Sequence, residues 1–389
     1  MIKLTNIFAA SLLTLSLNSF AASNCAPLSG EYSIGRSQNA DYPTIQQAAD
    51  ALMCGGVSSP VVMRLENGIY IEKVTLSNIP GTSALNTVVF ESASGEKTDV
   101  IVGYQSSDAT IDLNGTSYVS FENITVEHNK ASYGNCVRVD GKASHVAFKN
   151  VVMDGVETEA NGSASAVIYL TSAAAKEEMR IQDCELNNGS VGILKGGANT
   201  DDRDTKTIIT GNLCFNQNEA GMALSNEDAP EIANNVVSAV TTSEAFRGIT
   251  IRSASNQLII TKNIINTPNG AIGLALTDCE ALTTNMAQIT NNSIVAGGSG
   301  ISLNGSTDNL ILNFNRVKLS INGGGKAYYA NNGTGNNINM LNNIFYNEKT
   351  GGYTILGNSY KDFFNQLPGQ TSTMTASANS LSIEKVSIK

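Results

Sequence analysis

Short runs of alternating apolar and polar residues recur along most of the chain. One pattern reads apolar, any residue, apolar, polar, and it recurs every 25 to 31 residues. Its first apolar residue falls at Ile111, Val137, Ile168, Ile193, Met222, Ile249, Leu274, Ile301, Tyr328 and Ile355. In five copies a glycine stands directly before the pattern, at Gly192, Gly221, Gly248, Gly273 and Gly300. Such alternation predicts short strands with one buried face.

A second series of polar residues, almost all asparagine, follows the same spacing. It consists of Asn123, Asn150, Asp183, Asn212, Asn235, Asn263, Asn292, Asn315 and Asn343, at steps of 23 to 33 residues. Asparagine tolerates the left-handed backbone conformation of a tight bend, and its amide can hydrogen-bond to an equivalent residue in a neighbouring repeat. Both series average about 27 residues per step, which indicates a chain built of repeats.

Repeats of this length that contain only short strands predict a solenoid. Stacking each strand on its equivalent in the next coil gives parallel sheets, a continuous core and a spacing of about 4.8 Å between coils. The segments are too short, and too rich in Val, Ile and Thr, for helix pairs. Propeller blades need longer repeats, sandwiches keep no such register, and no leucine-rich frame is present. The predicted fold class is therefore all-β, a parallel β-helix.

The N-terminal segment supports this fold and carries a family resemblance. Residues 41–52 read as an amphipathic helix that starts near Pro43, with Ile45, Ala48, Ala49 and Leu52 on one face. The strand-like stretches 61–65 and 67–74 follow it. This opening is similar to that of pectin methylesterases, and with the two series it resembles the right-handed parallel β-helix of the pectin-lyase-like superfamily over residues 30–365. The resemblance implies that the helix covers the open end of the solenoid.

The catalytic motifs of that superfamily do not carry over. The Gln-Asp-Thr step and the Asp-Phe-Ile-Phe-Gly stretch of pectin methylesterases are absent, as are the Asn-Thr-Asp, Asp-Asp, Gly-His-Gly and Arg-Ile-Lys motifs of polygalacturonases. Pectate lyases require only an acidic calcium cluster beside an arginine, and this looser requirement stays open. The resemblance therefore predicts the fold and leaves the reaction undetermined.

Charge and the N-terminus predict an exported protein that acts on neither nucleic acid nor anionic membranes. The 34 acidic residues exceed the 24 basic ones, for a net charge of −10. Residues 1–21 read as a signal peptide, with Lys3, a short apolar run and a small-residue cleavage site ending at Ala21. We expect a single β-helix domain over 22–365 with its cap at 22–60, and a tail over 366–389. The mature chain is expected to be a monomer, extracellular or periplasmic, without a membrane span.

The chain has six cysteines, and export permits disulfides. Cys25 and Cys54 both fall in the N-terminal segment, and we expect them to pair. Cys184 and Cys214 lie about one repeat apart and are either stacked neighbours or separate buried thiols.

A first candidate site lies on the outward face of the strands. Asp112, Arg138, Asp140 and Tyr169 occupy outward positions on neighbouring coils. A carboxylate and guanidinium patch beside a tyrosine suits a sugar. Ordinary cross-strand ion pairing on a solvated sheet is the alternative interpretation.

A second candidate site centres on Arg252. Glu227 and Asp228 flank it on one coil, and Asp278 and Glu280 on the other. Several carboxylates suit Ca²⁺, which is the one candidate cofactor, and the arginine suits proton abstraction or a substrate carboxylate. We assign Arg252, Asp278 and Asp228 as the catalytic candidates, with surface ion pairing again the alternative. The acidic loop 199–206 lacks the EF-hand spacing and reads as a solvated turn.

Two functions follow from these observations. The first is a secreted protein that interacts with an extracellular polysaccharide, as a lyase or hydrolase acting on an acidic glycan. The second is a non-catalytic surface or structural β-helix, similar to an adhesin. The missing motifs and the Ala, Thr, Ser and Leu along the middle of the outward face favour the second.

Overall fold

The computed structural model describes residues 25–366 apart from the segments 106–107, 129–132, 174–175, 198, 240–243, 268–271, 321–324, 335–336, 347–352 and 358–359. The expected signal peptide, and all but the first residue of the expected tail, lie outside the described residues.

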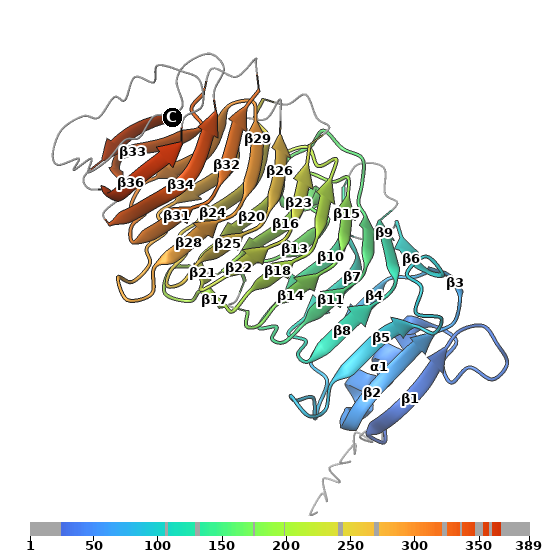
Figure 1. Ribbon diagram of the computed structural model, residues 1–389. Coiled ribbons are helices and arrows are strands. Elements are labelled where there is room, and N and C mark those ends of the chain that lie inside the picture. Colours follow the sequence, from blue (N-terminus) through green and yellow to red (C-terminus); the bar gives the residue numbers. More distant parts are fainter. Residues whose placement is uncertain are drawn as a thin grey trace, which may run out of the picture.

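The chain winds into a solenoid whose coils stack along one axis, with an N-terminal cap at one end (Figure 1). Each complete coil contributes one strand to each of three rows. Row 1 is an 11-stranded sheet, and rows 2 and 3 together form a 23-stranded sheet. The strands pair in parallel, each with its equivalent in the next coil.

The three rows have these members, in order along the axis. Row 1 contains β4 (Val74–Leu76), β7 (Ala109–Asn114), β10 (Asn135–Asp140), β13 (Ile168–Leu170), β16 (Val191–Gly196), β20 (Ala220–Ser225), β24 (Arg247–Arg252), β27 (Ile272–Thr277), β30 (Ser299–Asn304), β33 (Tyr328–Thr334) and β35 (Tyr353–Gly357). Row 2 contains β1 (Leu28–Ile34), β2 (Val57–Leu65), β5 (Val88–Ser92), β8 (Val119–Glu122), β11 (Ala147–Lys149), β14 (Arg180–Gln182), β18 (Ile208–Thr210), β22 (Glu231–Ala233), β25 (Ile259–Thr261), β28 (Ala287–Thr290), β31 (Leu310–Asn313), β34 (Ile338–Tyr346) and β36 (Tyr360–Gln366). Row 3 contains β3 (Gly68–Ile71), β6 (Val100–Tyr104), β9 (Thr125–His128), β12 (Val152–Asp154), β15 (Glu185–Asn187), β19 (Leu213–Phe215), β23 (Val236–Ser238), β26 (Ile264–Thr267), β29 (Ser293–Ala296), β32 (Arg316–Leu319) and the end of β34. Between rows 1 and 2, β17 (Asp204–Thr205) and β21 (Glu227–Asp228) form a small third sheet.

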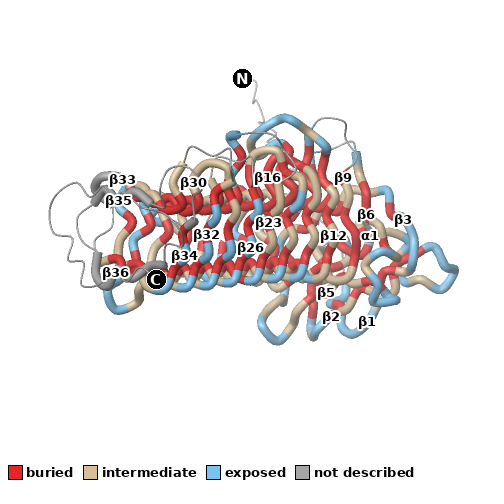
Figure 2. Tube along the Cα trace, turned by 45° about the horizontal axis from the view of Figure 1, so that its top comes forward, coloured by how far each residue is buried: buried red, intermediate tan, exposed pale blue. Residues whose placement is uncertain are grey.

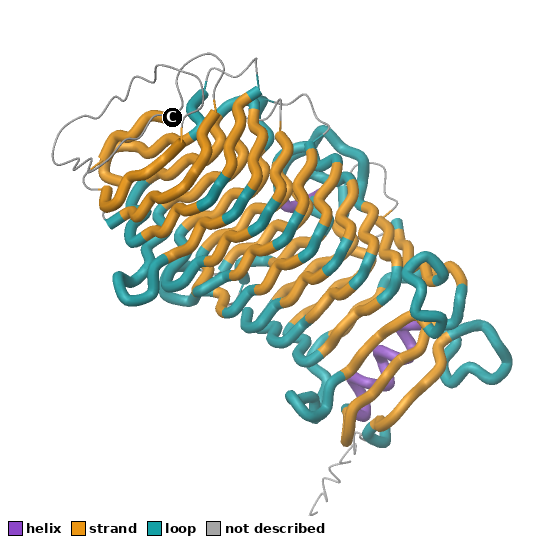
Figure 3. Tube along the Cα trace, in the orientation of Figure 1, coloured by secondary structure: helices purple, strands orange, loops and turns teal. Residues whose placement is uncertain are grey.

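One α-helix, α1 (Ile45–Gly55), lies at the N-terminal end of the solenoid, as Figure 3 shows. Its predicted apolar face is confirmed, because Ile45, Ala48, Ala49 and Leu52 are all buried. The helix begins later than the predicted residue 41. Thr44 accepts a hydrogen bond from the backbone of Gln47 at 3.1 Å and so ends the preceding turn as an N-cap. A further helical turn among the described residues, η1 (Ser163–Ser165), is a short 3₁₀ helix.

The core is a continuous column of apolar side chains that the three rows enclose, and buried and exposed positions alternate along the strands (Figure 2). Equivalent residues stack on one another in successive coils. The rings of Phe90, Phe121 and Phe148 stack in this way, with successive ring centroids 5.1 and 5.7 Å apart. Such stacking buries apolar area coil by coil, which is the main stabilising term of a solenoid.

The first repeat series is confirmed as a column of row 1 over eight of its nine steps. Cα partners run from Ile111 through Val137 to Tyr328 as predicted. The last step is wrong, because Tyr328 pairs with Tyr353 and Ile355 pairs with Ala330.

The glycines before the pattern lie in row 1, where the backbone passes very close to row 3. A Cβ added at Gly273 would lie 2.4 Å from the Cγ2 atom of Ile294 in row 3, so no side chain fits there.

The asparagine series proves to be two neighbouring columns in the turn between rows 2 and 3. Asn123, Asn150 and Asp183 have left-handed φ angles of 53°, 52° and 54° and form the first residue of the turn. The six later asparagines form its second residue, are buried and have no positive φ. The prediction joined the two roles in one residue, and this holds for Asn123 and Asn150, because Asn150 Nδ2 donates to Asn123 Oδ1 at 2.8 Å across two coils. From Asn212 on, the turn divides the roles: the left-handed residue comes first, and the asparagine that follows it hydrogen-bonds to its equivalent in the next coil.

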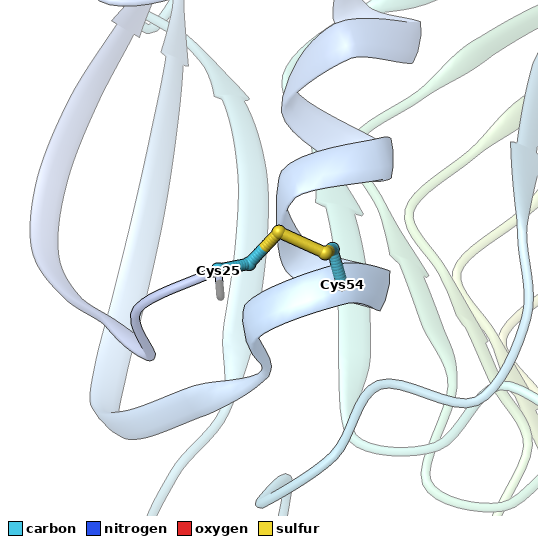
Figure 4. The surroundings of a disulfide bond; sticks show 2 residues. All are labelled: Cys25 and Cys54. Atoms are coloured by element: carbon cyan, nitrogen blue, oxygen red, sulfur yellow. A yellow bond between two sulfur atoms is a disulfide. The ribbon is translucent and has the colours of Figure 1, made fainter. Parts of the chain in front are cut away.

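The disulfide between Cys25 and Cys54 is confirmed, with a Cα–Cα distance of 5.6 Å. Figure 4 shows that it ties the segment before β1 to the last turn of α1. Cys184 and Cys214 are free and buried. They are not equivalent positions, because Cys214 pairs with Leu186, whereas the backbone of Cys184 contacts Asn212.

Candidate functional site

The outward face of row 1 brings the residues of the first candidate site together. Arg138 on β10 pairs in register with Asp112 on β7 and with Tyr169 on β13. Asp140 lies two residues further along β10, so it shares the outward face of that strand. We call Asp112, Arg138, Asp140 and Tyr169 the outer patch.

The charges of the outer patch are paired and hydrogen-bonded. Arg138 Nη2 lies 3.2 Å from Asp140 Oδ2, and Thr171 donates a hydrogen bond to Asp140 Oδ1 at 2.7 Å. The Thr171 hydrogen bond is the main cause that holds the pKa of the Asp140 carboxyl below its ordinary value. Lys73, which the sequence interpretation missed, lies 2.8 Å from Asp112 Oδ2. Lys73 directly precedes β4, the strand that pairs with β7. Its position in the sequence could therefore have predicted its place beside Asp112.

Tyr169 belongs to a small apolar cluster outside the main core. Ala166, Val191 and Ala220 are buried on the outer side of row 1, and Tyr169, Leu194 and Ala223 pack against them. Tyr169 is therefore only partly exposed, with part of its ring held by neighbours.

The segment between β12 and β13 lies beside this cluster. The backbone of Gly162 donates to Glu219 at 2.6 Å and accepts from the Ser190 hydroxyl at 2.6 Å. Asn218 donates to the carbonyl of Glu159 at 2.8 Å. These bonds fix the segment against the starts of the row 1 strands in the following coils.

A pocket of about 480 Å³ lies where the strands β10 and β13 end. Its walls include three cations, Lys142, Lys176 and Arg203, and two acids, Glu177 and Asp202. The pocket adjoins the outer patch, because Lys176 Nζ donates to the backbone carbonyl of Thr171, the residue that contacts Asp140. The sequence interpretation missed this pocket, since its lining residues come from turns in three different coils.

The side chains of the second candidate site lie less close together than those of the outer patch. Arg252 ends β24, is exposed, and pairs in register with Ser225 and Thr277. None of the ion pairs among the described residues involves Arg252. Its proposed partners accept hydrogen bonds in turns: Asp228 from the Ser255 hydroxyl at 2.7 Å, and Asp278 from the backbone of Ser306 at 3.0 Å.

The expectation that Glu227 flanks Arg252 on the surface is wrong. Glu227 is fully buried, and its carboxylate lies 2.8 Å from Lys195 Nζ inside the solenoid. Glu227 and Asp228 are consecutive residues of β21, so their side chains point to opposite sides of it. The side chain of Glu227 faces the core.

The acidic loop 199–206 is organised by its own residues. Asn199 Oδ1 accepts hydrogen bonds from the backbones of Asp201 at 2.8 Å and Asp202 at 3.0 Å, and Asp204 is buried. Within the described part of the chain, no three His, Cys, Asp or Glu side chains are grouped as metal ligands would be.

The comparisons with known proteins agree with this fold. The model of the family described as right handed beta helix region matches residues 109–286. The fold is similar to that of the Dettilon tailspike protein (gp208), with a TM-score of 0.56 and 12% identity; the match covers 85% of this chain and 64% of that one. This chain thus spans less than two thirds of the tailspike's length.

A second similar structure is PfbA, a surface adhesin of Streptococcus pneumoniae, with a TM-score of 0.50 and 17% identity, covering 78% of this chain and 87% of that one. The exopolygalacturonase from Thermotoga maritima has a TM-score of 0.47, too low to carry an argument, at 9% identity with 86% of each chain covered. No curated protein matches the sequence. The fold is therefore a right-handed parallel β-helix, as predicted.

A search for helices long and apolar enough to cross a membrane finds none among the described residues.

Proposed function

We propose that this is a secreted carbohydrate-binding protein that holds an acidic polysaccharide across the outer patch and the adjoining pocket. One observation carries the proposal: a charged and aromatic surface on row 1 continues into a pocket of about 480 Å³ whose walls include the cations Lys142 and Arg203. An extended glycan can lie across neighbouring coils with some of its acidic groups in the pocket.

The charges of this region suit an anionic ligand. The whole chain carries a net charge of −10, so an acidic glycan is repelled from most of its surface. Lys142 and Arg203 line the pocket beside Glu177 and Asp202 and offer cationic groups to an acidic ligand, whereas Lys176 is buried and donates to the Thr171 carbonyl. The guanidinium group of Arg203 has the fork of donors that matches carboxylates and sulfates.

The aromatic and neutral groups suit the rest of a sugar. The partly exposed ring of Tyr169 offers an apolar surface with a polar tip. Asp140 and Asp112 present carboxylate acceptors for sugar hydroxyl groups.

The fold comparisons and the cysteines support the same proposal. The structural neighbours include a tailspike protein and a surface adhesin. The disulfide between Cys25 and Cys54 fits an oxidising compartment, either the periplasm or the cell exterior.

Binding to a panel of soluble polysaccharides tests the proposal. Affinity gel electrophoresis should retard the wild-type protein with uronate or sulfated polymers but not with neutral ones, and added salt should weaken the retardation. Arg138→Ala and Lys142→Ala should each lower the affinity several-fold, whereas the matched control Arg316→Ala, on row 3, should not. Equal mobility of all proteins on every polymer would contradict the proposal.

Cleavage at Arg252, with Asp278 and Asp228 as partners and Ca²⁺ as a candidate ion, is the alternative proposal. It places the chemistry several coils away from the outer patch, so its variants test it separately.

A further inference from the structure

The interior of the solenoid contains a lysine where the fold otherwise places an apolar residue. Lys195 lies on β16 in an inward column of row 1, and its partners in the coils before and after it are Leu170 and Leu224. Its side chain has no solvent exposure. An amine in this position displaces a packed leucine, and a buried charge is costly unless it is fully paired.

Two buried carboxylates meet this amine. Lys195 Nζ contacts Asp204 Oδ2 and lies 2.8 Å from Glu227 Oε1, and both carboxylate side chains have no solvent exposure. Asp204 belongs to the same coil as Lys195, whereas Glu227 belongs to the next coil and pairs with Asp204 in the small third sheet. The three side chains therefore share one site without solvent exposure between two coils.

The two carboxylates have different surroundings. The backbone N–H of Lys176 donates to Asp204 Oδ1 at 2.7 Å, which polarises the carboxyl group of Asp204. The hydroxyl of Thr207 donates to Glu227 Oε2 at 2.6 Å and orients that carboxyl with its other oxygen toward Lys195. One carboxyl is thus arranged as an acceptor of nucleophilic attack, and the other as a proton relay.

We propose that Lys195 and Asp204 form an intramolecular isopeptide bond, with Glu227 as the catalytic proton relay. This inference is independent of the proposed carbohydrate binding. The reactants already touch, and their fixed position removes the entropic cost of bringing them together.

The reaction needs no oxidant or cofactor. It starts from the neutral pair, after the Lys195 ammonium has passed one proton to Asp204 Oδ2. The Lys195 amine attacks Cγ of Asp204, the new C–N bond forms, and negative charge develops on Oδ1 beside the Lys176 N–H. Glu227 takes a proton from the nitrogen and gives it to the departing oxygen. The C–O bond then breaks, the amide and one water molecule are released, and Glu227 is regenerated.

The environment favours this neutral route. Burial raises the pKa of the Glu227 carboxyl and lowers the pKa of the Lys176 ammonium, so the charged forms of these two neighbours are disfavoured. Amide formation removes one positive and one negative charge from the interior.

The bond has a structural consequence. Lys195 and Asp204 are separated by nine positions, so the bond closes the acidic turn between β16 and β17 into a covalent ring. A turn closed in this way holds the floor of the pocket, to which Asp202, Arg203 and Thr205 contribute.

Mass spectrometry of the purified mature chain tests the proposal, once its N-terminus has been determined by sequencing. After reduction and denaturation, the chain should be lighter than its sequence mass by one water molecule. Glu227→Gln, which keeps both reacting groups, should have its full sequence mass. The control Glu231→Gln, on β22, should still show the loss of water.

A tryptic map locates the bond without relying on any variant. Trypsin should fail to cleave after Lys195 and should release a branched peptide that joins 181–203 to 204–206. This species has the same mass as the uncleaved linear peptide 181–206, so its fragment ions must show two N-termini, at Ile181 and Asp204. A wild-type chain of full sequence mass, or ordinary cleavage after Lys195, would overturn the proposal. A branch on Glu227 would overturn the assignment of Asp204.

Discussion

The side-chain amide of Asn235 donates a hydrogen bond at 3.0 Å to the side-chain oxygen of Asn263, one coil further along the solenoid. The backbone N–H of Asn235 donates to the same oxygen, also at 3.0 Å. Asn263 repeats the arrangement with Asn292. Buried turn groups are thereby satisfied from Asn212 to Asn343 by a single continuous column of amides.

Breaking this column is expected to destabilise the solenoid. Asn263→Ala removes four side-chain hydrogen bonds and leaves buried partners unsatisfied, so the free energy of unfolding should fall by about 3 kcal/mol. Urea unfolding measures the change. The control is Asn291→Gly at the exposed left-handed position of the next turn, where φ is 58°. It should alter stability by no more than about 0.5 kcal/mol. Equal losses in the two variants would contradict the assigned role.

The disulfide is expected to stabilise the N-terminal cap. It joins residues 29 positions apart, and a cross-link of that span typically contributes about 3 kcal/mol. The double variant Cys25→Ser, Cys54→Ser should therefore unfold at a lower temperature than the wild type. A reductant should lower the Tm of the wild type and leave that of the double variant unchanged. Identical wild-type Tm values with and without reductant would show that the bond contributes nothing.

The catalytic assignment of Arg252 makes a separate prediction. Incubation with a panel of uronate polymers, with and without Ca²⁺, should raise the absorbance of unsaturated chain ends, and Arg252→Ala should abolish the rise. Asp278→Asn and Asp228→Asn should slow it strongly, because each removes a proposed partner. No rise with any polymer would exclude the lyase and leave the binding proposal standing.

The Thr171 hydroxyl is expected to control the ionisation of Asp140. Its hydrogen bond favours the ionised carboxylate, so Thr171→Val should raise the pKa of Asp140 toward its ordinary value. NMR titration of the carboxyl carbons measures this. A lowered pKa in the folded state contributes stability that is present above the unfolded pKa and is lost as pH falls through the folded pKa. The stability difference between wild type and variant should therefore disappear in acid. Thr261→Val, on row 2, is the control and should leave the pKa of Asp140 unchanged.

The sequence could predict residues of the candidate site only where they lie on regular strands. Arg138 and Asp112 could be placed side by side because both lie in a run of strict alternation, in which the coil period fixes the neighbour and the strand period fixes the face. Lys142, Lys176 and Arg203 lie in turns of unequal length, so no period connects them. Glu227 was placed on the wrong side for the same reason.

The sequence by itself determined the stacking of this protein. Regular spacing of apolar residues and asparagines defines which residues become vertical neighbours, because each coil can bury its apolar face only against the next. Only the tertiary structure decided which side chains of the turns point into the interior. At the corner between rows 2 and 3, the residue with positive φ, such as Asn234, directs the next side chain, Asn235, into the interior. The same local geometry, at Asn226, directs Glu227 inward to Lys195 and Asp204, where burial makes its chemistry different from that of a surface charge.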